Sequence, residues 1–346
     1  MEGAGALGPA LGARASLAEI LPQIIPEGGF FLCDIASPLP KSDLGTLEHP
    51  MFSLATRPDR RVLRYEHGGV SVEVTPSVKG RATIHDKDVL IYCVSQLMAA
   101  LNAGRAVGRT LKLRAADLMA ATRRESSGDG YKRLVQAFER LAGTRITTNV
   151  VTGGVECTTG FGLIESWRVV RRVGGRMGSV AVTISEWLFR AVLGGAVLTL
   201  SRDYFALRRP LERRLYEIAR KHCGRQPEWR IGLDTLIKKT GSSSPRRVFR
   251  RMLRECIEAD RMPDYRLELE DDLLRVTPRG APGGALGLGA APVVSPDALE
   301  RARALAPGWD VHALEAEWRG FWARSGRARL RSPDAAFLGW VAKRVG

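Results

Sequence analysis

Five arginines recur at helical spacing in one short stretch of the chain: Arg246, Arg247, Arg250, Arg251 and Arg254. The apolar residues between them fall on the opposite face of a helix from about residue 245 to 259: Val248, Phe249, Met252, Leu253, Cys256 and Ile257. Neighbouring guanidinium groups repel one another by roughly 0.2–0.5 kcal/mol per i,i+4 pair. Phosphates along the major groove of DNA would remove that repulsion, so the pattern predicts a DNA-reading helix. The alternative is a solvated basic face with Glu255 and Glu258 as partners.

A second helix, predicted over residues 130–142, has a similar division of faces. It buries Tyr131, Leu134, Val135, Phe138 and Leu141 and exposes Lys132, Arg133, Gln136 and Arg140. Lysine, arginine and glutamine supply the donors and acceptors that pair with guanine and adenine edges in the major groove. Because this helix is less basic, a helix that only supports a protein–protein interface is the alternative.

Lys238 and Lys239, at the end of the helix before the arginine-rich one, belong to the predicted DNA-binding set, as do Arg171 and Arg172 of a predicted hairpin. A second hairpin offers Arg266, Arg275 and Arg279. Hairpin arginines contact the DNA backbone or the minor groove in some proteins and only maintain solubility in others, and both interpretations stay open. The acidic run of residues 268–272 would be repelled by phosphate, so we expect it to point away from DNA.

The chain contains none of the sequence patterns that common catalytic or cofactor sites require. There is no GxxxxGK followed by Ser or Thr, and KKTGSSSP has its lysines before the glycine. GLGAAP fails the dinucleotide fingerprint, and no serine lies in a GxSxG elbow. The histidines form no HxH or HExxH pattern and the five cysteines form no CxxC pair, which argues against a zinc site and against a disulfide framework. We expect no enzymatic activity and no metal or other cofactor.

The charge balance points to a polyanionic partner. Lysine and arginine number 53 against 37 aspartate and glutamate residues, which gives a net charge of +16. Neutralising phosphates with these side chains would release condensed counterions and favour binding to nucleic acid. No apolar run approaches the roughly 18 residues of a membrane span, and no secretion signal is evident. We expect a cytoplasmic protein without a membrane partner.

The elements that must position these helices follow the same order twice. In the first pass, alternating stretches within 61–78 predict a small sheet, and Asp86 is expected to cap a helix over 87–103. A strand (TLKL), a helix over 114–122 and the helix over 130–142 follow. After them come two alternating stretches, RITTNVV and GFGLIESWRVVRR, separated by Gly153 and Gly154. In the second pass, a helix over 210–223 precedes a strand (WRIG), a helix over 233–240, the arginine-rich helix and a hairpin, DYRLELEDDLLRVTPR.

Helix, strand, helix, turn, helix and ribbon is the order of a winged helix-turn-helix. The sequence therefore predicts an α+β fold with two tandem winged helix-turn-helix domains and a small C-terminal helical piece. The predicted divisions are a disordered leader (1–16), an N-terminal winged-helix domain (17–197), a second winged-helix domain (198–278), a flexible linker (279–296) and a small aromatic-rich helical domain (297–346).

Aromatic residues crowd into the C-terminal piece: Trp309, Trp318, Phe321, Trp322, Phe337 and Trp340. A small helical unit needs large side chains because its core is small. The alternative is a docking module for a partner protein, or for single-stranded DNA whose bases stack on the aromatic rings.

Residues 48–98, EHPMFSLATRPDRRVLRYEHGGVSVEVTPSVKGRATIHDKDVLIYCVSQLM, resemble the RepA-type plasmid replication initiator proteins of proteobacteria. TPSVKGRATIHDKDVLIYCVSQLM is the most specific portion. The resemblance continues through LTLSRDYFALRRPLERRLYEIARKHCG at 198–224 and covers most of residues 17–278. The C-terminal segments APGWDVHALEAEWRGFWARSG and SPDAAFLGWVAKRV resemble a tail found on members of this group.

This resemblance implies tandem winged helices that bind short direct repeats of double-stranded DNA at a plasmid origin. It further implies melting of nearby AT-rich DNA and recruitment of a host replication initiator and helicase. A homodimer formed through the first domain and repression of the protein's own promoter are implied in the same way.

A dedicated transcriptional regulator is the main alternative, and a DNA-processing enzyme is a third. Direct repeats beside an AT-rich tract would favour initiation, whereas a single palindrome would favour a two-fold symmetric repressor. Nicking, ATP hydrolysis or strand transfer by the pure protein would favour the enzyme.

Overall fold

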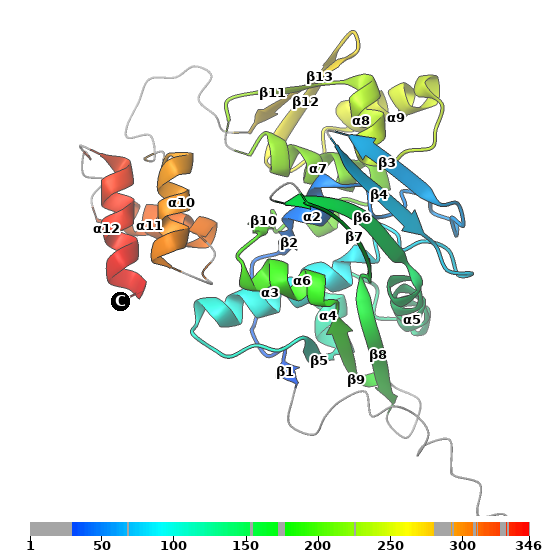
Figure 1. Ribbon diagram of the computed structural model, residues 1–346, viewed down its shortest axis with the longest axis horizontal. Coiled ribbons are helices and arrows are strands. Elements are labelled where there is room, and N and C mark those ends of the chain that lie inside the picture. The colour runs from blue at the N-terminus through cyan, green and yellow to red at the C-terminus, as the bar shows by residue number, and fades with distance from the viewer. Residues whose placement is uncertain are drawn as a thin grey trace, which may run out of the picture.

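The computed structural model describes residues 30–345 apart from 68, 153–154, 172–176, 225, 280–291, 293, 307–308, 310, 326–329 and 331. Its described part is a mixed α+β fold with three hydrophobic cores. We call the part up to residue 199 the N-terminal module, residues 200–279 the second module and residues 294–345 the C-terminal unit (Figure 1). The predicted leader and most of the predicted linker lie outside the described residues.

Helix α3, Lys87–Asn102, is the centre of the N-terminal module. Every side chain from Lys87 to Met98 is buried, because the helix is packed on all sides. It contacts α4 (Ala115–Ala121), α6 (Glu186–Leu193) and β2 (Lys41–Asp43). Asp86 precedes α3 as predicted, but its side chain makes no capping hydrogen bond.

A four-stranded sheet of this module has the order β1-β5-β9-β8, with β1 parallel to β5 and the other pairs antiparallel. Its strands are β1 (Phe31–Leu32), β5 (Thr110–Arg114), β8 (Ile164–Arg171) and β9 (Met177–Ile184). Helix α5, Gly128–Gly143, packs on β8, where Phe138 stacks on Trp167 with ring centroids 5.6 Å apart. The sheet thus supports the buried face of α5, the predicted DNA-reading helix of the first pass.

A second sheet, of order β3-β4-β6-β7, corrects one sequence prediction. Its strands are β3 (Leu63–His67), β4 (Val70–Thr75), β6 (Arg145–Thr152) and β7 (Val155–Gly162). The two alternating stretches after α5 are predicted to pair with each other and form the ribbon that closes the first pass. In the structure, β6 from the first stretch pairs with β4 and β7, and most of the second stretch forms β8 in the other sheet. Buried Leu163 lies between β7 and β8, so GFGLIESWRVVRR contains the end of one strand and all of the next. The closing hairpin is β8–β9.

The second module contains the elements that the second pass predicts. They are α7 (Pro210–His222), β11 (Trp229–Gly232), α8 (Leu233–Thr240), α9 (Arg246–Ala259), β12 (Tyr265–Glu270) and β13 (Leu273–Pro278), after a 3-10 turn at Tyr204–Ala206. Gly241 ends α8 with φ of +67°, a left-handed conformation that glycine adopts without strain. The chain then turns directly into α9.

The two modules repeat one arrangement of elements. In each, a helix, a strand, two helices and a hairpin follow one another, and the first strand pairs with the second strand of the hairpin: β5-β9-β8 and β11-β13-β12. The N-terminal module carries the β6–β7 pair as an insertion before its hairpin. The repeated order predicted from periodicity is therefore present, with an insertion that periodicity did not reveal.

Helix α7 is held against the N-terminal module by buried ion pairs. Lys87 Nζ lies 2.8 Å from Glu217 Oε1, and Arg213 pairs with Asp88. Burial lowers the pKa of Lys87 and raises that of Asp88, so each group needs its partner to stay charged. Arg214 donates to the carbonyl oxygens of residues 46–48, which end α2 (Leu44–Glu48), and of Lys239. These contacts join both modules in one body.

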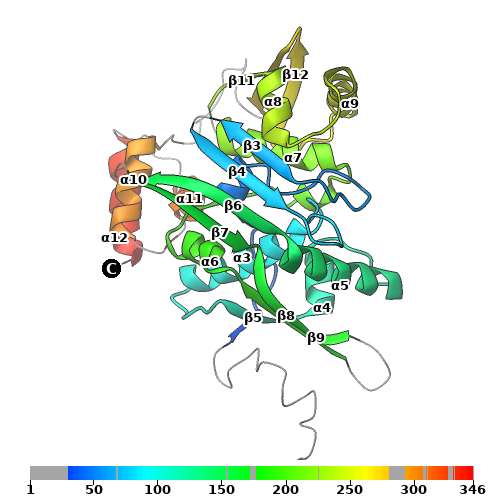
Figure 2. The same ribbon diagram turned by 45° about the vertical axis from the view of Figure 1, so that its right-hand side comes forward.

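The boundary predicted after residue 197 falls inside β10 (Val197–Thr199), which pairs with β2. The C-terminal unit consists of α10 (Pro296–Leu305), α11 (Val311–Arg324) and α12 (Pro333–Val345), packed around Trp318 and Phe337. It lies on the side of the body opposite α5 and α9 (Figure 1, Figure 2). Among the described residues, every helix is too short or too polar to span a lipid bilayer.

Candidate nucleic-acid interface

Helix α9 has one face in the core of the second module and one basic face. Phe249, Leu253 and Cys256 are buried, and Val248, Met252 and Ile257 are half-buried, as the helical spacing predicts. The arginines differ in environment, because Arg246, Arg247, Arg251 and Arg254 are exposed whereas Arg250 is half-buried.

Asp272, at the tip of the β12–β13 hairpin, lies on the first turns of α9. Its carboxylate is 2.6 Å from Arg246 and 2.9 Å from Arg250, and Asp234 of α8 also pairs with Arg246 at 2.8 Å. Hydrogen bonds from Arg246 hold the pKa of Asp272 below its usual value. The acidic run of residues 268–272 is expected to point away from DNA, but Asp272 lies on the predicted DNA-reading helix and is a partner of its arginines in addition to Glu255. In the free protein, Arg246 and Arg250 fix the hairpin on α9.

Three arginines remain directed to solvent, at one helical face of α9: Arg247, Arg251 and Arg254. We call them the α9 row. Arg251 has a carboxylate oxygen of Glu255 at 3.8 Å, and no ion pair of Arg247 or Arg254 with a described residue is found. The row is the part of the predicted cluster that is available to a polyanion.

The two lysines at the end of α8 lie in different environments. Lys238 is exposed, but Lys239 is buried and pairs with Glu48 of α2. Burial alone would raise the pKa of Glu48, yet hydrogen bonds from His222 and Lys239 lower it well below its usual value. The prediction of Lys239 as a DNA contact is corrected, because its ammonium group joins the two modules.

Helix α5 exposes Lys132, Arg133 and Gln136, as predicted. Lys132 pairs with Asp129 at 3.1 Å and Arg133 with Glu125 at 2.7 Å, and all four side chains are largely exposed. Exposed pairs of this kind contribute little to stability, so a phosphate can replace the carboxylate at small cost. α5 and α9 lie on the same side of the body (Figure 1, Figure 2).

The side chain of Arg140, unlike those of Lys132 and Arg133, is not available to a phosphate. Its side chain is 18% exposed and lies 2.7 Å from the carboxylate of Asp86, which is 4% exposed. Two hydrogen bonds join the groups, from Nε and from Nη2. The prediction of Arg140 as a base-reading residue is therefore corrected: it neutralises the carboxylate that precedes α3.

Replacement of Arg140 by alanine is expected to reduce stability rather than DNA affinity. It leaves a buried carboxylate without its main partner, which costs about 1–3 kcal/mol. Urea unfolding measures this loss, and Arg133→Ala, on an exposed position of the same helix, is the matched control with a change within about 0.5 kcal/mol. An Arg140→Ala protein as stable as the wild type but weak in DNA binding would contradict this assignment.

The arginines of the two predicted hairpins, which were candidates for DNA contacts, are only partly described by the structure. Arg172 lies outside the described residues, and so does the side chain of Arg171, which ends β8. In the second module, Arg275 pairs with Glu228 and Glu268, and Arg279 pairs with Asp260, whereas Arg266 is exposed.

The loop of residues 55–61, for which no DNA contact was predicted, lies between α5 and α9. Ala55 borders both a groove of about 580 Å³ along α5 and a pocket beside α9. The groove is lined by Arg57, Arg124 and Arg208 next to Arg133 and Gln136. The signal for this loop was its own sequence, RPDRR at 57–61, which has three arginines but no periodicity.

His85 lines the groove, but burial and nearby Arg213 and Arg124 lower its pKa to about 4, so its imidazole is neutral near pH 7. Among the described residues, no group of three or more His, Cys, Asp or Glu side chains could hold a metal ion.

Residues 41–267, which span both modules, match the family model Replication initiator protein A. A curated protein of Wigglesworthia glossinidia brevipalpis, provisionally named as a replication protein, is 35% identical over 245 residues, covering 69% of this chain and 89% of that protein.

The fold is similar to the crystal structure of domains 2 and 3 of RctB. A selenomethionine derivative of these domains aligns with a TM-score of 0.52 and 14% identity, covering 68% of this chain and 98% of that one. A second crystal structure of the same domains aligns with a TM-score of 0.43 and 14% identity, covering 66% and 95%.

Proposed function

Because this chain belongs to the replication initiator protein A family, we propose that it starts plasmid replication by binding repeated duplex sites at the origin. The two modules act as tandem winged helices, with α5 and α9 as the recognition helices and β8–β9 and β12–β13 as the wings. The repeated strand orders β5-β9-β8 and β11-β13-β12 support this assignment.

The observation that carries the proposal is the α9 row. Its three arginines share one face and are exposed, and α9 lies on the same side of the body as α5, which exposes Lys132, Arg133 and Gln136. The buried ion pairs of α7 fix the distance between the two helices. A rigid pair of recognition helices matches two major-groove segments at fixed spacing and therefore favours a defined repeat.

A DNase footprint over the intergenic DNA that flanks the gene tests the proposal. Several evenly phased, protected direct repeats are the expected result for the purified protein at near-physiological ionic strength. A single protected inverted repeat over a promoter would instead identify a transcriptional regulator, the second candidate function.

The protein is proposed to act by binding alone, in the cytoplasm, without a metal or other cofactor. Opening of AT-rich DNA, recruitment of a host initiator and helicase, homodimer formation through the N-terminal module and repression of its own promoter complete the proposal. Nicking or ATP hydrolysis by the pure protein would contradict the binding-only role.

Deletion of residues 297–346 is expected to leave repeat binding unchanged and to impair replication. The C-terminal unit has its own core and lies away from α5 and α9, so its loss removes no proposed DNA contact. Repeat affinity by mobility shift and plasmid establishment in cells are the two measurements. Loss of repeat binding in the truncated protein would overturn this separation of roles.

A further inference from the structure

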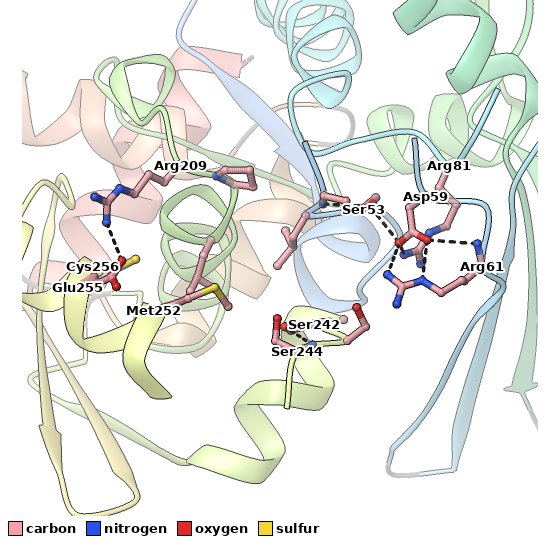
Figure 3. A pocket seen from close by; sticks show the side chains of 16 residues that line it. Ser53, Asp59, Arg61, Arg81, Arg209, Ser242, Ser244, Met252, Glu255 and Cys256 are labelled. Atoms are coloured by element: carbon pink, nitrogen blue, oxygen red, sulfur yellow. Dashed lines mark hydrogen bonds and ion pairs between the residues drawn. The ribbon is translucent and has the colours of Figure 1, made fainter. Parts of the chain in front are cut away.

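A pocket of about 310 Å³ lies between the two modules, beside α9. Figure 3 shows the acidic and basic side chains of one wall, which come from the N-terminal module: Asp59, Arg61 and Arg81. The opposite wall comes from α9 with Met252, Glu255 and Cys256, and the turn between α8 and α9 adds Ser242 and Ser244 (Figure 3). Two modules therefore contribute to one site.

Arg81, in the wall of this pocket, is a buried arginine with unused hydrogen-bond donors. It is 5% exposed, and its Nη2 donates to Asp59 at 2.7 Å. Its Nε and Nη1 are buried and have no hydrogen-bond partner among the described residues. Buried donors without an acceptor are destabilising, so an acceptor from outside this chain would be bound favourably.

The charges around Arg81 favour an anion. Hydrogen bonds from Arg61 and Arg81 hold the pKa of Asp59 well below its usual value, so its charge is already neutralised. Glu255 is flanked by Arg209 at 3.6 Å and by Arg251 at 3.8 Å. With three arginines against two engaged carboxylates, the lining keeps a net positive charge.

The lining also matches the parts of a nucleotide unit. Arginine and serine side chains donate to phosphate oxygens, and apolar Leu54, Leu211 and Met252 offer contacts for a sugar. The mouth is next to the α9 row, because Glu255 lines the pocket and contacts Arg251. The loop of residues 55–61 continues from here to the groove along α5.

We propose that this pocket binds a phosphate group of the DNA backbone, at the point where one strand passes between α5 and α9. Arg81 donates from the wall of the N-terminal module, and Arg61, which lies beside it on Asp59, donates from the rim (Figure 3). This inference rests on the proposed function, since the phosphate belongs to the duplex that the two recognition helices hold. The contact reads no base and instead fixes the register of the protein on its site.

The test combines a modified DNA with a variant of Arg81. Ethylation interference on the footprinted repeat is done first. It identifies the phosphate, between the two protected segments, that the full-length protein requires for binding. A methylphosphonate at that position, which removes the charge, is expected to weaken wild-type binding by about tenfold, the size of one charge-assisted hydrogen bond. Arg81→Gln is expected to lose the same factor on unmodified DNA and nothing further on the modified DNA.

Two further variants keep the result interpretable. Arg105→Gln, which removes an exposed arginine paired with Asp34, keeps full sensitivity to the methylphosphonate. If Arg81→Gln does not unfold cooperatively, Arg61→Gln replaces it, because Arg61 is exposed and shares Asp59. Independent, multiplicative losses from the variant and the modified DNA, or wild-type affinity of the variant, would overturn the proposal.

A titration of the free protein with inorganic phosphate separates the sources of the anion. If phosphate raises the melting temperature of the wild type but not of Arg81→Gln while the DNA effects stay independent, the pocket takes free phosphate and the backbone assignment is wrong. If the protein binds no duplex repeat, the proposed function fails on its own, and the phosphate titration alone decides whether the pocket is an anion site.

Discussion

Simultaneous replacement of Arg247, Arg251 and Arg254 by alanine is expected to abolish specific binding to the origin repeats. Each base or phosphate contact of this kind contributes about 1–3 kcal/mol. Loss of three contacts should therefore weaken binding by at least about 100-fold, since about 1.4 kcal/mol corresponds to a factor of ten. Mobility shifts over a range of salt concentrations measure the loss of affinity and show how much of it comes from contacts with phosphates. The slope of log K against log salt should fall by about one for each arginine that contacts a phosphate.

The control for this variant removes the same charge elsewhere. Arg105, Arg190 and Arg301 are exposed and belong to the N-terminal module and the C-terminal unit, away from α9. Their combined replacement by alanine should leave repeat affinity nearly unchanged at physiological salt. Equal losses in both triple variants would mean that net charge, rather than the face of α9, determines binding.

Replacement of Glu217 by glutamine is expected to give the largest loss of stability of any single change discussed. Lys87 is 1% exposed and Glu217 0%, so the variant removes the carboxylate with which this buried ammonium group is paired. Breaking a buried pair in this way costs about 3–5 kcal/mol. The melting temperature should fall by roughly 6–20 °C, given about 2–4 °C per kcal/mol for a chain of this size class.

Two further proteins test the reason for that loss. Lys87→Met combined with Glu217→Gln removes the stranded charge and keeps one amide oxygen as an acceptor for Tyr204 or Arg214, so it should recover part of the stability. Glu186→Gln, which affects only exposed pairs with Arg109 and Arg190, should change the free energy of unfolding by less than about 1 kcal/mol. An unchanged melting temperature of Glu217→Gln would show that α7 is not fixed by this pair.

Local patterns predicted the helices well, because amphipathic spacing depends on nearby residues. The apolar stripe of α9 and the exposed face of α5 both followed from i,i+4 arithmetic. The order of elements in the second module followed in the same way, with Gly241 marking the end of α8.

Partners distant in the sequence decided which basic residues remain available, and no local pattern could reveal them. Arg140 and Asp86 are 54 positions apart, and Lys239 and Glu48 are 191 apart. Asp272 reaches Arg246 across 26 positions because the hairpin folds back onto α9. The loop of residues 55–61 was missed for a related reason: it gains its place between α5 and α9 only from the packing of the two modules.

Replication from a plasmid that carries only the flanking intergenic DNA, with the protein supplied in trans, tests the central claim most directly. Wild-type protein is expected to establish the plasmid, and the variant lacking Arg247, Arg251 and Arg254 is expected to fail although it is folded and present at the same level. Failure of the wild-type protein to establish a plasmid whose repeats it binds, or equal establishment without any protein, would contradict the claim that this chain is the initiator of its own replicon.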